Sequence, residues 1–189
     1  PQYFGEGITI LDGKIFQLTW QSGTGFIYDL GDFSLIREFQ IDGEGWGLTN
    51  DGKNLILSDG SDKIMFLDPQ TLKIVKKISV TLNGKPQYYL NELELIKGEI
   101  WANVWEKDDI LRINKDTGTV KNILDLSNIS ERSYSQNVAN GIAWDQKKDI
   151  IYVTGKFWKN IYQLKVNESK ILHRSIVEKF FNTCRYLFK

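Results

Sequence analysis

The chain contains very little cysteine, histidine and proline, and the first two shortages exclude whole classes of chemistry. Of its 189 residues, 1 is Cys, 1 is His and 3 are Pro. The single Cys184 cannot form an internal disulfide or a thiolate cluster. The single His173 cannot build a zinc site or serve a Ser or Cys nucleophile as base, and no carboxylate series has calcium-loop spacing. We therefore expect no metal and no cofactor.

The sequence also lacks an excess of charge of one sign and any long apolar run. It has 24 basic and 24 acidic residues, which are interspersed along the chain. This balance predicts no nucleic-acid or anionic membrane surface, and it favours a small or neutral ligand as the partner. No apolar run approaches the roughly 20 residues that cross a bilayer, so we expect a soluble protein without membrane insertion. The chain begins at Pro1 without Met and shows no secretory signal, which leaves its compartment open.

A weak internal repeat is the most informative feature that is present. Its copies are spaced by about 40, 45 and 49 residues, the range typical of four-stranded propeller blades. If the first strand of each blade lines a central channel, the residues that open the copies meet at one end of it, where a site would form. The aligned starts are Glu6-Gly7, Trp46-Gly47, Asn91-Glu92 and Asn140-Gly141.

Apolar runs separated by turn residues predict the remaining strands of each blade. In the first two copies Asp12-Gly13 and Asp51-Gly52 supply the positive φ of a tight hairpin. The last copy shows no clear fourth strand. Second strands are expected over 15–20, 55–58, 100–105 and 150–154, third strands over 26–29, 64–68, 110–114 and 161–166, and fourth strands over 35–39, 74–80 and 120–124.

The pattern thus predicts an all-β fold, a β-propeller with four recognisable blades over residues 1–166. A content of 13% aromatic residues and 16 Gly suits a β-rich protein with many turns. Residues 167–189 lose the strand pattern and place apolar residues at helical spacing, which predicts a short C-terminal helix packed on the last blade or on an open edge.

Several polar and aromatic residues at blade starts and second-strand ends are candidates for a site. Each also has an ordinary structural interpretation. The carboxylate can be a solvated turn residue, the indoles can pack between blades, the amides can bind local backbone, and the lysine can be a solvated loop cation. The candidates are Glu6, Trp20, Trp46, Asn91, Asn103, Trp105, Asn140 and Lys156.

Seven strings, in this order, resemble the plant and bacterial type of glutaminyl cyclase. Each string alone is modestly specific, whereas their order along residues 3–166 makes the resemblance strong. They are Tyr3-Phe4-Gly5-Glu6-Gly7-Ile8-Thr9, Gln17-Leu18-Thr19-Trp20, Gly45-Trp46-Gly47-Leu48-Thr49 with Asp51-Gly52, Leu90-Asn91-Glu92-Leu93-Glu94, Trp101-Ala102-Asn103-Val104-Trp105, Asn140-Gly141-Ile142-Ala143 and Thr154-Gly155-Lys156-Phe157-Trp158.

The resemblance implies a five-bladed propeller and a glutaminyl-peptide cyclotransferase, an acyltransferase that converts N-terminal glutamine to pyroglutamate and releases ammonia without a catalytic metal. It implies peptides or proteins with N-terminal glutamine as partners, and a secreted or periplasmic location. The family normally has a further blade upstream, which this chain lacks. A non-catalytic binding or structural propeller therefore stays open as the alternative.

The resemblance also implies roles for individual residues. Glu6 matches the acid that shuttles a proton, and Asn91 and Lys156 match groups beside the reacting atoms. Between flanking indoles Glu6 loses solvation, so we expect its pKa to be raised. The implied substrate-binding residues are Gln17, Trp20, Trp46, Asn103, Trp105 and Asn140.

Overall fold

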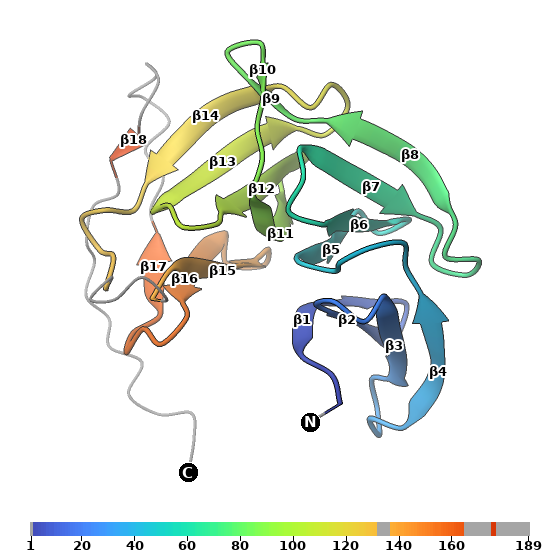
Figure 1. The fold of residues 1–189 in the computed structure, drawn as a ribbon. Coiled ribbons are helices and arrows are strands. Elements are labelled where there is room, and N and C mark those ends of the chain that lie inside the picture. The colour runs from blue at the N-terminus through green and yellow to red at the C-terminus, as the bar shows by residue number, and fades with distance from the viewer. Residues whose placement is uncertain (1, 132–136, 165–174, 177–189) are drawn as a thin grey trace.

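The computed structural model describes residues 2–131, 137–164 and 175–176. Within these ranges the secondary structure consists of strands and turns, with no helix. Figure 1 shows four antiparallel sheets arranged in an arc around a common centre, with their first strands β1, β5, β11 and β15 innermost. The predicted all-β propeller with four recognisable blades is confirmed.

Each blade is a sheet in which strands that follow one another in the chain pair side by side. The first blade contains β1 (Gly5–Leu11), β2 (Lys14–Thr19), β3 (Thr24–Asp29) and β4 (Leu35–Gln40). The second contains β5 (Leu48–Asn50), β6 (Leu55–Ser58), β7 (Lys63–Leu67) and β8 (Ile74–Ser79). The third contains β11 (Leu90–Ile96), β12 (Glu99–Val104), β13 (Asp109–Asn114) and β14 (Val120–Asp125), and the fourth contains β15 (Ala139–Asp145), β16 (Ile150–Gly155) and β17 (Tyr162–Leu164).

Two short elements lie outside this scheme. The strands β9 (Thr81–Leu82) and β10 (Lys85–Pro86) form a separate hairpin, and β18 (Ser175–Ile176) pairs in parallel with β14. Apart from the two residues of β18, the tail expected to be helical lies outside the described residues, as do Cys184 and His173. No helix that could cross a membrane is found in the part of the chain that the structure describes.

The two predicted Asp-Gly turns differ in the structure. Asp12 and Gly13 both have positive φ, 50° and 70°, and close a two-residue hairpin as predicted. The prediction for Asp51-Gly52 is wrong in this respect, because only Gly52 has a positive φ, 80°. Asp51 instead accepts hydrogen bonds on Oδ1 from the backbone N–H groups of Lys53, at 3.0 Å, and Asn54, at 2.6 Å. This Asx-type turn lengthens the loop between β5 and β6.

The core fills the spaces between neighbouring blades, and the second strands β6 and β12 are buried on both faces. In β6, Leu57 belongs to the cluster shared with the first blade, and Ile56 to the cluster shared with the third. In β12, Ala102 and Trp101 likewise face the second and fourth blades. Successive side chains of a strand point to opposite faces, so such strands are apolar at consecutive positions.

Close backbone contacts join the starts of the inner strands. The N–H of Gly7 donates to the carbonyl of Trp46 at 2.8 Å. The Ser58 hydroxyl accepts from the N–H of Gly47 at 2.9 Å and donates to the carbonyl of Asn91 at 2.7 Å. A Cβ on Gly47 would lie 2.1 Å from that carbonyl oxygen, so the approach of the second and third blades requires glycine here.

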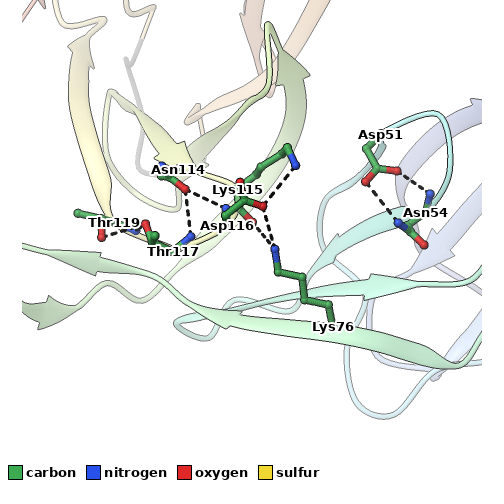
Figure 2. Close-up of polar contacts among 8 residues, drawn as sticks. All are labelled: Asp51, Asn54, Lys76, Asn114, Lys115, Asp116, Thr117 and Thr119. Atoms are coloured by element: carbon green, nitrogen blue, oxygen red, sulfur yellow. Dashed lines mark hydrogen bonds and ion pairs between the residues drawn. The ribbon is translucent and has the colours of Figure 1, made fainter.

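The outer rims of these two blades are joined by polar contacts (Figure 2). Lys76 on β8 donates from Nζ to the carbonyl of Lys115 at 3.0 Å and to Oδ1 of Asp116 at 3.2 Å. The Asn114 side chain holds the receiving turn by accepting from the N–H groups of Asp116 and Thr117 at 2.9 and 3.0 Å. The blades are therefore fixed to each other at the periphery as well as at the centre.

Candidate active site

Antiparallel pairing brings the start of each first strand beside the end of the following second strand. Gly5 pairs with Thr19, Leu90 with Val104, and Ala139 with Gly155. A pocket of about 220 Å³ lies at this edge of the blades. Its lining residues are Phe4, Glu6, Trp20, Trp46, Asn91, Trp105 and Lys156.

The structure thus brings together all three residues that the resemblance made catalytic, Glu6, Asn91 and Lys156, with the three predicted indoles. They come from four different blades and are up to 150 residues apart in the chain. Phe4 is a lining residue that the sequence reasoning did not single out. Its signal was its place two residues before Glu6, in the string that opens the first blade.

Three other predicted binding residues do not line the pocket. Asn103 is fully buried, and its Oδ1 accepts from the N–H of Gly141 at 3.0 Å, so it joins the third and fourth blades. Its Nδ2 has no hydrogen-bond partner among the described residues. Gln17 lies within β2, paired with Ile8, and Asn140 lies within β15. Their assignment as substrate-binding residues stays a prediction.

Glu6 and Lys156 form an ion pair within the pocket. Oε1 of Glu6 lies 3.7 Å from Nζ of Lys156, and the two side chains are 16% and 32% exposed. Burial raises the pKa of Glu6, whereas the charge of Lys156 opposes that rise. The expected direction is confirmed. A carboxyl group with a raised pKa is a better base than an exposed one and a usable acid nearer neutral pH.

Aromatic rings surround this pair. Phe4 and Trp20 meet edge to face, with centroids 5.9 Å apart, and Trp46 and Trp105 do the same at 6.0 Å. The Lys156 ammonium lies 5.1 Å from the ring centroid of Trp105 and 5.9 Å from that of Phe4. The rings supply an apolar wall, and their faces stabilise positive charge inside it.

Two further carboxyl groups, Glu92 and Glu94, belong to β11, and Glu92 lies close enough to Glu6 for their charges to interact. Burial, and then the charges of Glu94 and Glu6, raise the pKa of Glu92 to about 8. Burial also raises the pKa of Glu94, which accepts from the Thr49 hydroxyl at 3.0 Å and the Trp144 N–H at 3.2 Å. The sequence pattern did not single out Glu92 as a site residue. Its signal was the carboxylate at the repeat position that is Gly in the other three copies.

No group of three or more His, Cys, Asp or Glu side chains within the described ranges could hold a metal ion. The chemistry available from the described lining residues is that of one carboxyl group, one ammonium group, one amide and the aromatic rings. Such a set can move a proton and stabilise an anionic oxygen.

Comparison with solved structures shows where this fold recurs. The crystal structure of Myxococcus xanthus glutaminyl cyclase is 34% identical and superposes with a TM-score of 0.81, over 86% of this chain and 72% of that one. A Bacteroides caccae protein of unknown function, at 12% identity and a TM-score of 0.61, shares the fold, with coverage of 91% of this chain and 60% of that one.

Sequence comparison gives the family. A glutaminyl-peptide cyclotransferase from Arabidopsis thaliana is 42% identical over 94% of this chain. The alignment covers 57% of that relative, so the chain spans little more than half of its length. The family model for glutamine cyclotransferase matches residues 1–166, the whole of the four-bladed region. The chain therefore belongs to the glutamine cyclotransferase family.

Proposed function

We propose that this chain carries the active site of a glutaminyl-peptide cyclotransferase, which converts an N-terminal glutamine to pyroglutamate and releases ammonia. The observation that carries the proposal is the Glu6 carboxyl group, with its raised pKa and its Lys156 partner, inside an aromatic pocket. Family membership gives the reaction class, because two relatives carry this activity in their names.

The reaction needs proton transfer at two nitrogen atoms. The substrate's α-amine attacks the carbonyl carbon of its own side-chain amide, which forms the ring C–N bond. The amide C–N bond then breaks, and ammonia leaves. Glu6 accepts the proton that the amine loses and returns a proton to the departing nitrogen, so one carboxyl group serves both steps. The nucleophile is tethered to its target, and the substrate itself supplies much of the proximity effect.

Lys156 and Asn91 serve the oxygen of the reacting amide. This oxygen gains negative charge when the amine adds, and an ammonium or amide N–H donor aimed at it stabilises that charge. Asn91 is 4% exposed, and the pocket is walled by rings, so a bound substrate is shielded from water. Shielding strengthens these electrostatic contacts and keeps water from competing with the amine.

The decisive variant is Glu6→Gln, which keeps the shape of the side chain and removes its proton transfer. We expect ammonia release from a glutaminyl dipeptide to fall by roughly a hundredfold to ten-thousandfold, the usual cost of losing general acid–base catalysis. Glu38→Gln, on the exposed face of β4, is the matched control. Parental turnover in the Glu6 variant would remove this residue from the mechanism.

The same assay tests the alternative of a binding propeller without turnover. The exposed Ile8 and Ile10 side chains on β1, 57% and 55% accessible, favour this alternative, because an exposed apolar surface can bind a partner. A chain that binds the dipeptide and releases no ammonia would establish it.

A further inference from the structure

Glu44 forms the polar link between two indoles of the pocket wall. Its Oε2 accepts hydrogen bonds from Nε1 of Trp20 at 2.9 Å and from Nε1 of Trp46 at 2.8 Å. An indole has one donor and no acceptor, and one carboxylate oxygen can accept both N–H groups. Both rings are therefore fixed by a single atom outside the lining set.

This link completes a closed series of contacts around the pocket. Phe4 packs on Trp20, and Trp46 packs on Trp105, so each pair forms one part of the wall. Lys156 lies over a ring of each pair, Phe4 and Trp105. Glu44 joins the other two rings of the pairs. The Lys156 ammonium and the Glu44 carboxylate thus each link one ring pair to the other.

The backbone beside Glu44 is held where this contact requires it. The N–H of Gly45 donates to the carbonyls of Thr19 and Trp20, at 3.2 and 3.0 Å. A Cβ on Gly45 would lie 2.8 Å from Cβ of Leu18, so the loop before β5 can approach the end of β2 because this residue is glycine. The carboxylate is therefore placed by the fold beside both indoles.

We propose that Glu44 is a positioning residue that orients Trp20 and Trp46 for substrate binding in the pocket. This inference rests on the proposed function for the identity of the substrate. Glu44 does not line the pocket, so its effect is transmitted through the two rings. Loss of its carboxylate frees both indoles and weakens binding more than it slows the chemical step.

The first test observes the indole N–H groups and does not depend on turnover. The chain has 6 Trp residues, and Trp20→Phe and Trp46→Phe assign two of their indole signals in ¹H–¹⁵N NMR spectra. In Glu44→Ala we expect these two signals to move upfield and to exchange faster with solvent, while the others stay in place. Glu38→Ala is the control, because its carboxylate is exposed on β4 of the same blade. Unchanged signals for Trp20 and Trp46 would overturn the inference.

The second test separates binding from chemistry. With a glutaminyl dipeptide, Glu44→Ala should raise KM by roughly tenfold or more, as expected from losing the two hydrogen bonds that hold the indoles, and leave kcat within about twofold. Glu44→Gln keeps an acceptor oxygen without the charge, and it should restore most of the lost affinity. A Gln variant as weak as the Ala variant would show that the charge acts directly, and a fall in kcat at constant KM would place Glu44 in the chemical step. Either result overturns the positioning role.

A chain without turnover would refute the proposed function and still leave this inference testable. NMR titration with the same dipeptide then measures affinity directly. Weaker binding to Glu44→Ala than to Glu38→Ala would support the positioning role, and equal affinities would refute it.

Discussion

Replacing Glu92 by Gln should make the protein more stable at alkaline pH. Burial and the nearby charges of Glu94 and Glu6 raise the pKa of Glu92 to about 8, from 4.5 for an ordinary glutamate. The folded state therefore binds the Glu92 proton more tightly than the unfolded state does. Gln resembles the neutral carboxyl group in shape and cannot ionise, so it removes this linkage to pH.

The sign and size of the effect follow from the pKa values. The stabilisation that comes from protonated Glu92 is fully present below its pKa in the unfolded chain, near 4.5. It is lost as the pH rises through the pKa of Glu92 in the folded protein, about 8. Over this interval the free energy of unfolding falls by about 1.4 kcal/mol per pH unit, which amounts to on the order of 5 kcal/mol. That loss is comparable to the whole stability of many domains.

Denaturant unfolding followed by tryptophan fluorescence, at pH values from 5 to 9, measures the effect. We expect the parent chain to lose stability across this range, and Glu92→Gln to give a flatter curve that lies above the parent's at high pH. Glu38→Gln controls for removal of an exposed charge. Parallel curves for the parent and Glu92→Gln would show that this carboxyl group titrates normally in the folded protein, and would refute the reasoning.

Two further predictions concern the blade contacts and the ion pair. Gly47→Ala should lower the free energy of unfolding by about 2 kcal/mol or more, because its Cβ would lie 2.1 Å from the Asn91 carbonyl oxygen; an unchanged denaturation midpoint would show that the blades can separate without cost. Burial raises the pKa of Glu6, and the charge of Lys156 opposes that rise. Lys156→Met removes the opposing charge, so it should move the acid limb of the pH profile of kcat/KM to higher pH. A limb that stays in place, measured on whatever activity remains, would mean that another group controls it.

Much of the blade architecture was predictable because the strands obey local rules. The predicted strand over 55–58 coincides with β6, and the other second strands agree within a residue at each end. The turn at Asp51 was not predictable from the dipeptide. Its conformation depends on which backbone N–H groups the Asp51 side chain reaches. Here the side chain accepts from the N–H groups of Lys53 and Asn54, and these hydrogen bonds stabilise a longer loop in place of the two-residue turn.

The site was predictable for residues that open successive copies of the repeat, because the starts of the copies meet in space. Glu6, Trp46 and Asn91 open successive blades, and the structure places them in one pocket. Asn103 shows the limit of motif reasoning, because it belongs to a matching string and yet binds Gly141 between blades. Ser58 occupies the equivalent position in the second blade, since Leu57 pairs with Leu48 as Ala102 pairs with Leu93. Ser58 also binds backbone of two blades, so its equivalence to Asn103 in the repeat was a signal that Asn103 has a structural role.

Glu44 was missed for a different reason. Its partners, Trp20 and Trp46, lie on two blades, and their meeting depends on the path of the loop before β5. Local patterns do not encode such a path, because it is set by packing between elements that are distant in the chain.

The division of the pocket among blades makes the proposed activity a sensitive indicator of partial unfolding. The first blade supplies Glu6, and Lys156 follows β16 of the fourth blade, so the ion pair spans the two ends of the described propeller. Separation of the fourth blade would remove the cation while leaving the carboxyl group and most of the aromatic wall in place. The proposed activity would then be lost while most of the sheets remained folded, and its loss on heating would precede the main unfolding transition.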